Sequence, residues 1–113
     1  MRIAYKVWLE NEGKSFGEGP YKLLKGVERT GSLHRAAADT KMSYQKAWTI
    51  IHRCEERLGF QLLVRKVGGV SGGGSTITPS GQVFLRQYES FRVELKDVLQ
   101  DLYQKHFGRN ENI

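Results

Sequence analysis

The chain opens with an alternation of apolar and polar side chains. Every second residue is apolar from the third to the ninth position, at Ile3, Tyr5, Val7 and Leu9. A period of two places these side chains on one face of an extended segment, so the pattern predicts a half-buried β-strand. The following "NEGK" is typical of a turn, and residues 15–17 can form a short return strand. We therefore expect an N-terminal strand hairpin.

The apolar spacing changes to three and four residues after Gly19 and Pro20. Proline is tolerated at the first position of a helix, because its missing N–H would have no partner there. We expect a helix that begins at this point and ends at Gly31, a residue type common just past helix ends. Its buried side would be formed by Leu23, Leu24 and Val27.

Two further helices are expected directly afterwards. Ser32 is a suitable N-cap for the first of them and Ser43 for the second, and "DTKM" interrupts the apolar pattern between them. The first would pack closely through Leu33, Ala36 and Ala37. The inner stripe of the second would be Ala47, Ile50 or Ile51, Cys54 and Leu58. Two helices with so short a connection predict a helix-turn-helix unit, whose second helix enters the major groove of DNA.

The next segment has the pattern of a β-hairpin. "FQLLVRKV" and "STIT" are expected as strands on either side of the glycine-rich "GGVSGGG". A hairpin in this position after a helix-turn-helix would be a wing. The spacing of Gly69 and Gly74 also fits a nucleotide-binding phosphate loop, but Ser75 stands where that motif needs lysine, and no parallel βαβ unit surrounds it.

Thr78 and Pro79 provide an N-cap and a first position for a last helix, which is expected to run to about Phe107. Its apolar residues are spaced 4, 3, 4, 3, 4, which is the seam of a coiled coil. They are Phe84, Tyr88, Phe91, Leu95, Val98 and Leu102. A helix of this length spans roughly 40 Å, more than a three-helix core covers. We therefore expect a homodimer, with residues 1–78 as the winged helix-turn-helix domain and residues 79–113 as the dimerisation helix and tail.

Charge supports a polyanionic partner. The chain has 113 residues, the size of one domain, and a formal net charge of +6 from 18 Lys plus Arg and 12 Asp plus Glu. Eight of the basic residues and only three of the acidic ones lie between Arg29 and Lys66, so a net +5 falls on the helix-turn-helix and the wing. A clustered excess of this kind favours nucleic acid.

The side of the third helix opposite its apolar stripe carries hydrogen-bond donors and aromatic rings. We predict that this face and the wing contact DNA, with the serine N-caps placing backbone N–H groups toward phosphates. Gln45 is suited to adenine, Arg53 to guanine or a phosphate, and Lys46 to a phosphate. An ordinary solvated face is the alternative, most of all for the large ring of Trp48. The predicted DNA-binding residues are Ser32, Ser43, Tyr44, Gln45, Lys46, Trp48, Thr49, His52, Arg53, Arg65, Lys66, Gly72 and Gly73.

The stretch "TGSLHRAAADTKMSYQKAWTIIHRCEERLGFQLLVRKVGG", followed by "GGGSTITPSG", resembles the winged helix-turn-helix of LysR-type regulators. The "SY..AW" opening of the third helix, the "GG…GGG" wing tip and the leading hairpin are more similar to the molybdate-responsive ModE-type regulators. The resemblance implies an α+β fold and a DNA-binding transcriptional regulator. The ModE-type pattern continues into a molybdate-binding domain, whereas this sequence ends at Ile113, so we expect a short form or an excised domain.

Other classes of function find little support. We find no nucleophile with a base, no paired carboxylates and no metal-ligand cluster, so neither an enzyme nor a cofactor is expected. The single cysteine, Cys54, fits a small core residue, and His34 and His52 fit surface or contact positions. No apolar run is long enough to span a membrane and the N-terminus lacks a signal-peptide pattern, so we expect a cytoplasmic protein.

Two alternative functions stay open at this point. The aromatic face could bind another protein, or the chain could act alone as a molybdate or oxyanion sensor. We do not expect molybdate to bind this chain, because its donors lie on the predicted DNA face or in the open wing, and the tail after Gly108 is too short to add a pocket. The sequence leaves open the operator, the target genes and the direction of regulation.

Overall fold

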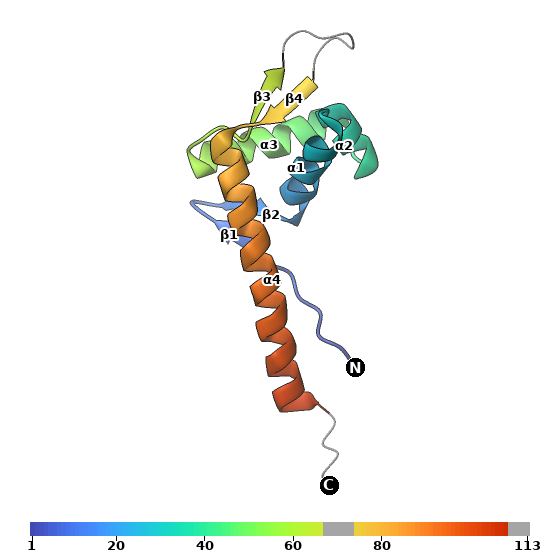
Figure 1. Ribbon diagram of the computed structural model, residues 1–113, viewed down its shortest axis with the longest axis vertical. Helices are drawn as coiled ribbons and strands as arrows, with labels where there is room; N and C mark the ends of the chain where they lie inside the picture. The colour runs from blue at the N-terminus through green and yellow to red at the C-terminus, as the bar shows by residue number, and fades with distance from the viewer. Residues whose placement is uncertain (67–73, 109–113) are drawn as a thin grey trace.

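The computed structural model describes residues 1–66 and 74–108. In chain order the elements are β1 (Trp8–Glu10), β2 (Lys14–Gly17), α1 (Glu18–Thr30), α2 (Leu33–Asp39), α3 (Tyr44–Leu58), β3 (Leu63–Lys66), β4 (Gly74–Ile77) and α4 (Pro79–Phe107). Three short helices and two strand pairs form one end of the molecule, and α4 projects away from them (Figure 1). The molecule is therefore long and narrow, with extents of 66 × 29 × 23 Å. No helix within the described ranges is long and apolar enough to cross a membrane.

The predicted caps fix the three short helices. Ser32 Oγ accepts the backbone N–H of Arg35 at 3.1 Å, and Ser43 Oγ accepts that of Lys46 at 3.1 Å. Gly31 ends α1 with a left-handed φ of 72°, a conformation that favours glycine. The predicted start of α1 was wrong: the helix begins at Glu18, so Pro20 is its third residue rather than its first.

The core lies where α1, α2 and α3 meet the first turns of α4. Its largest fully buried side chains are Phe16, Leu23, Leu24, Ile51, Leu62 and Leu85. α1 and α2 approach very closely at one point, because a Cβ on Gly26 would lie 2.6 Å from Cβ of Ala36. This close crossing sets the position of α2, and through α2 the position of α3.

The N-terminal hairpin is shorter than predicted. β1 covers only three residues, and it pairs antiparallel with β2 through Leu9 opposite Phe16. Residues 1–7 are not a strand, because β2 turns into α1 at Glu18 and so provides no pairing partner for them. The predicted buried face is also only partial, since Tyr5 is exposed and the fully buried hairpin side chain is Phe16.

The wing is an antiparallel pair, β3 with β4, in the register Leu63 opposite Ile77 and Lys66 opposite Gly74. It is tied to the turn between α1 and α2, where Ser75 N–H donates to Gly31 O at 2.9 Å. The first strand starts at Leu63 rather than at Phe60, whose ring packs at 5.8 Å against that of Phe84. The predicted wing residues Gly72 and Gly73 lie outside the described residues.

α4 begins as predicted, with Thr78 Oγ1 accepting the Gly81 N–H at 2.9 Å and Pro79 as the first residue. Its first turns belong to the core rather than to an exposed strip. Tyr88 is buried, and its ring meets Phe16 edge-on at 4.8 Å, as does that of Phe84. The predicted seam is thereby corrected for these two residues: the exposed apolar side of α4 starts at Phe91.

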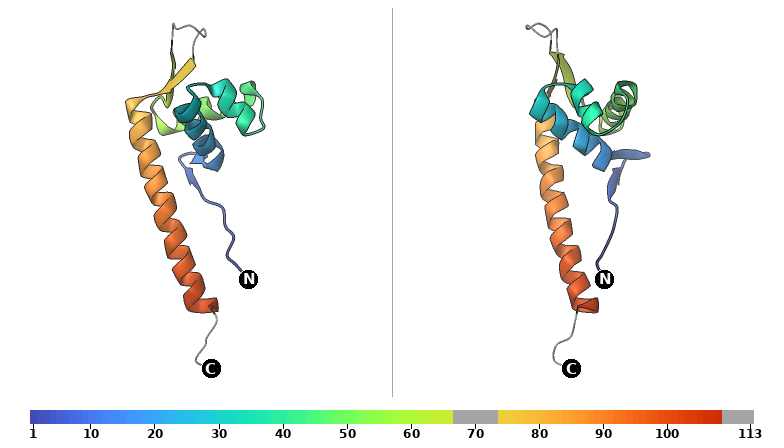
Figure 2. Two further views of the ribbon diagram at one scale, coloured as in Figure 1. Left: turned by 45° about the vertical axis from the view of Figure 1, so that its right-hand side comes forward. Right: turned by 90° about the vertical axis from the view of Figure 1, so that its right-hand side faces the viewer.

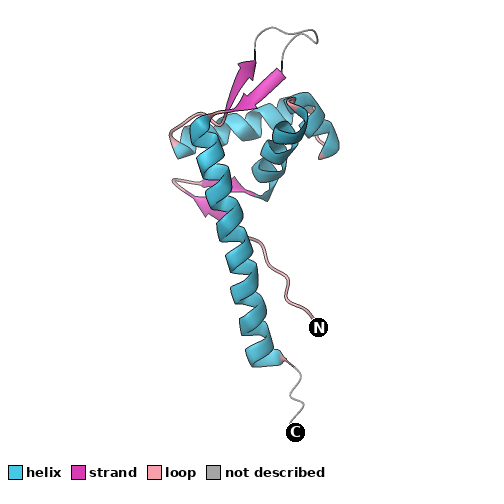
Figure 3. Ribbon diagram, viewed as in Figure 1, coloured by secondary structure: helices cyan, strands magenta, loops and turns pink. Residues whose placement is uncertain are grey.

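Charged side chains hold α4 against α1. Lys25 pairs with Glu89 at 3.0 Å, Arg86 reaches Glu28, and Arg92 reaches Glu18. Burial raises the pKa of Glu89, but hydrogen bonds from Lys25 and the Tyr21 hydroxyl outweigh it and leave this pKa below its usual value. These contacts add to the aromatic packing on Phe16, which seats the first turns of α4 on the core. The result is an α+β winged helix-turn-helix with a long C-terminal helix, the predicted fold class (Figure 3).

Candidate nucleic-acid interface

α3 has two distinct faces. Ala47, Ile51 and Cys54 are buried against the core. Around the rest of the helix, the predicted contact residues Gln45, Lys46, Trp48, Thr49 and Arg53 are exposed, while Tyr44 and His52 are half-buried. The structure therefore places this part of the predicted site on the outside of α3. Donors and rings, rather than the usual Lys and Glu, make up most of that surface.

Two stacked ring pairs stiffen the exposed face. Trp48 and His52 lie one helical turn apart, and their rings stack at 3.7 Å with an interplanar angle of 19°. The His52 ring is oriented by Nδ1, which donates to the Trp48 carbonyl oxygen at 2.9 Å. One side of the indole is thus covered, and Trp48 still has 45% of its surface exposed. A ring held in this way loses little freedom on binding another molecule.

The second pair brings in a residue that sequence reasoning left out of the site. His34, in the first turn of α2, stacks on Tyr44 at 3.7 Å with an interplanar angle of 7°. The two residues belong to different helices, so no spacing along one helix could have indicated the contact. The pair extends the aromatic surface from the start of α3 to the start of α2.

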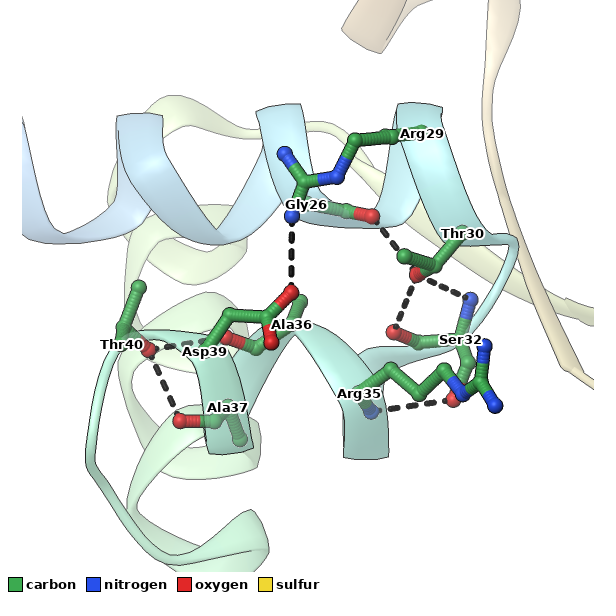
Figure 4. A network of polar contacts seen from close by, with 9 residues as sticks. All are labelled: Gly26, Arg29, Thr30, Ser32, Arg35, Ala36, Ala37, Asp39 and Thr40. Atoms are coloured by element: carbon green, nitrogen blue, oxygen red, sulfur yellow. Dashed lines mark hydrogen bonds and ion pairs between the residues drawn. The ribbon is translucent and has the colours of Figure 1, made fainter.

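Several charges counted in the sequence are already engaged within the protein. Arg29 pairs with Asp39 at 2.8 Å, as Figure 4 shows beside the Ser32 cap. Arg57 donates to the Lys14 carbonyl oxygen at 2.7 Å and accepts the Asn11 side chain at its own carbonyl, so it holds the N-terminal hairpin. The Glu55 carboxylate accepts the backbone N–H of Leu62 at 2.7 Å and fixes the start of the wing. The side chains of these residues make contacts within the protein, between α1 and α2, at the N-terminal hairpin and at the start of the wing.

The remaining basic side chains are exposed around α3 and the wing. Lys46 and Arg53 lie on α3, Arg35 lies on α2, and Arg65 and Lys66 lie on β3. The wing rises beside α3 at the end of the molecule away from the tip of α4 (Figure 2). The capping hydroxyls of Ser32 and Ser43 also border this surface, and each retains its own proton to donate. The arrangement suits an anionic, ridged partner such as the DNA backbone.

Cys54 lies beneath this surface, and its thiol is expected to be unreactive. It is 5% exposed, and burial raises the pKa of its thiol to about 11. Because the thiolate is the reactive form, this cysteine is suited to packing rather than to redox or nucleophilic chemistry.

Comparison with known proteins agrees with this geometry. The model of the bacterial regulatory helix-turn-helix family of LysR type matches residues 21–82, which is more than half of the chain. The chain belongs to this family. The matched residues run from α1 through the wing into the first turn of α4, so they include the whole exposed face of α3. The family is one of transcriptional regulators and not a family of enzymes.

Curated relatives include ModE proteins. The chain is 31% identical over 93 residues to the molybdenum transport protein ModE of Azotobacter vinelandii, covering 82% of this chain and 34% of that protein. It is 33% identical over 85 residues to the DNA-binding transcriptional dual regulator ModE of Escherichia coli K12, covering 75% and 29%. The molybdenum-pterin-binding protein MopB of Rhodobacter capsulatus is 31% identical over 98 residues, covering 87% and 36%. The chain spans about a third of the length of these relatives.

A solved structure supports the fold. The crystal structure of a LysR family transcriptional regulator matches with a TM-score of 0.59 and 18% identity, covering 81% of this chain and 30% of that one. This likeness shows the fold alone. It agrees with the winged helix-turn-helix arrangement described above.

Proposed function

We propose that the chain binds double-stranded DNA as a homodimer and regulates transcription. The exposed face of α3 carries the proposal. It offers side chains that can hydrogen-bond to base edges, and stacked rings, next to a basic wing. The chain also belongs to a family of transcriptional regulators. α3 would lie in the major groove with its exposed side toward the base edges.

The exposed side chains divide into two groups by chemistry. Gln45, in the first turn of α3, would pair with adenine through its amide, and Arg53 would reach guanine or a phosphate. Lys46, Arg65 and Lys66 would neutralise phosphates, which positions the protein without reading sequence. Trp48 and Tyr44 would add apolar contacts to base edges or sugars.

The proposed homodimer follows from the outer half of α4. Phe91 is 43% exposed, Val98 54% and Leu102 46%, and each lies on the predicted seam. These side chains line one side of the helix, and apolar side chains gathered on one exposed face commonly mark an interface. Two copies paired along α4 would present two α3 helices to one DNA site.

Selection from a random-sequence duplex library tests the function. The enriched sequences should share two half-sites related by a two-fold axis, with centres about 34 Å apart or a multiple of that distance. Lys105→Ala provides a matched control, because it removes one positive charge from the last turn of α4, at the far end from the wing. The control should select the same motif, whereas recovery of no motif by the unmodified chain would contradict the proposal.

We further propose that molybdate does not control this interface through residues of this chain. The donors on α3 and on the wing are exposed, whereas a specific oxyanion site needs donors that converge in a sheltered pocket. The basic side chains that border the cavity beside α4 are exposed as well, and one of them, Arg92, is paired with Glu18. Calorimetry with molybdate, with sulfate as the control, should show no selective site. Saturable micromolar binding that sulfate cannot displace would mean that the chain, or its dimer, is itself the sensor.

A further inference from the structure

Residues 1–7, here called the N-terminal arm, do not join the hairpin as the sequence predicted. The arm leaves β1 in an extended form and runs beside the outer half of α4 (Figure 2). Ile3 and Val7 are half-buried, and Tyr5 is 45% exposed. The apolar side chains of the arm are therefore only partly covered by the rest of the chain.

The arm and α4 are aligned antiparallel over a matching length. Two cavities lie between them: one is bordered by Tyr5 and Val7 with Phe91 and Leu95, the other by Ile3 with Leu102 and others. Six residue steps of extended chain span about 20 Å. The helix rises by a similar roughly 20 Å from Phe91 to the turn around Tyr103. The arm therefore follows the same stretch of α4 on which the exposed apolar strip lies.

The space between the arm and α4 is larger than the small voids that imperfect packing leaves inside proteins. The two cavities measure about 620 and 490 Å³. Protein interiors contain few voids larger than a water molecule. The groove has an apolar floor, formed by Phe91, Leu95 and Leu102, and a rim that includes charged side chains such as Lys6 and Lys96. A groove of several hundred Å³ with an apolar floor and a charged rim is a surface that accepts side chains from elsewhere.

We infer that this groove receives the α4 helix of a second copy, and that the arm of each chain packs across the partner's helix. The inference rests on the proposed homodimer and adds a component to it. A two-fold interface joins the same patch on both subunits, and here one apolar strip on α4 forms both a wall of the groove and the surface that would enter it. The second copy's α4 is thus the occupant whose chemistry and length match.

Charge can orient the arm on the same partner. Arg2 and Lys6 alternate with the apolar residues of the arm. The outer half of α4 exposes acidic residues on one side, Glu94, Asp97 and Asp101, and basic residues on another, among them Arg92 and Lys96. The basic side of one arm would then cross the acidic side of the partner's helix. Exposed ion pairs contribute little to affinity, so their part is to orient the arm. The apolar residues of the arm contribute the binding.

Photocross-linking tests the location of the arm. Tyr5, being exposed, is replaced by the photoreactive p-benzoylphenylalanine, and unlabelled protein is mixed with ¹⁵N-labelled protein so that adducts between two chains are distinguished by mass. We expect adducts between chains that map to residues 91–107. The same probe at Thr49, on the exposed face of α3, is the control and should give none there. Adducts confined to the arm's own chain, or a chain that is monomeric, would overturn the inference.

Deletion of residues 2–7 separates this inference from the proposed function. The fully buried core residues all follow the arm, so the variant should keep its helical circular dichroism. We expect its dimer to dissociate at least tenfold more readily in sedimentation, while its affinity for a DNA half-site stays unchanged. Unchanged dimerisation would overturn the role of the arm. Absence of half-site binding by the full chain would instead contradict the proposed DNA function.

Discussion

At the scale of single residues, the exposed face of α3 combines side chains with separable tasks. Gln45 and Arg65 are both exposed. In the proposed complex Gln45 would read a base, and Arg65, on β3 of the wing, would neutralise a phosphate. Between them, Trp48 is held by its stack on His52 and by the hydrogen bond that orients the His52 ring. Because base reading depends on sequence and charge neutralisation does not, substitutions at the two kinds of position should leave different signatures.

Gln45→Ala and Arg65→Ala make that contrast measurable. Loss of the amide should relax discrimination at one base position, by about 1–3 kcal/mol between the preferred and other bases. Loss of the guanidinium should weaken binding to all sequences alike and reduce the dependence of log affinity on log salt by ~0.9. Fluorescence anisotropy with duplexes varied one base pair at a time gives both quantities. If Gln45→Ala weakened binding to all duplexes equally, Gln45 would not be a base-contacting residue.

Cys54 offers a test of the buried side of α3. Its pKa of about 11, raised by burial from 9.0, means that near pH 8 the native protein holds roughly a hundredfold less thiolate than an exposed cysteine. Alkylation by iodoacetamide should therefore be slow in the native protein and fast in urea, with Cys54→Ser as the blank. Since the pKa is raised on folding, this burial stabilises the fold below pH 9 and stops doing so as the pH rises through about 11. Equal alkylation rates in both states would show that α3 is not seated on the core.

At the scale of elements, the parts that local chemistry specifies could be predicted from the sequence. Serine caps at Ser32 and Ser43, the Thr78–Pro79 start and the left-handed Gly31 each act within a few residues of their own position, and all are confirmed. The outward face of α3 followed from its 3.6-residue period in the same way. The strand predicted for the N-terminal arm was wrong, because alternation of apolar and polar residues cannot show whether a partner strand exists. The His34–Tyr44 stack was missed because it joins two helices.

The crossing of α1 and α2 yields a prediction against the usual helix preference. Alanine normally stabilises a helix by about 1 kcal/mol over glycine. At Gly26 the new Cβ would lie 2.6 Å from that of Ala36, so Gly26→Ala should destabilise the protein by about 1–3 kcal/mol. Gly19→Ala is the matched control, because nothing lies within 4 Å of its Cβ position in the same helix. Urea unfolding compares them, and a stabilised Gly26→Ala would mean that the two helices cross less closely.

At the scale of the whole molecule, α4 has two parts with different surroundings. Its first turns complete the core through Leu85 and Tyr88, and its outer half exposes the apolar strip. The packing of these first turns on the core, with ion pairs to α1 such as Arg92 with Glu18, sets the angle between the two parts. In a dimer formed along α4, this angle would determine the separation of the two α3 helices, and hence the spacing of half-sites on DNA.

Leu95→Glu tests the role of the outer half of α4. A carboxylate in the apolar strip would have to be buried in the dimer, so the variant should sediment as a monomer and bind a two-part site far more weakly than wild type. Its affinity for a half-site should be unchanged. Gln100→Glu is the control, because it adds a negative charge at an exposed position on the side of α4 away from the strip. A dimeric Leu95→Glu variant would place the interface elsewhere.

Titration of duplex DNA with the unmodified chain at 50 mM and 200 mM salt tests the central claim most directly. Basic side chains on α3 and on the wing would each displace counterions from a phosphate, so log affinity should fall linearly with log salt. Six phosphate contacts would lower the affinity by about a thousandfold between the two conditions, with retained preference for the selected two-part site. Absence of binding at 50 mM salt, or binding that does not change with salt, would contradict the proposal that α3 and the wing form a DNA interface.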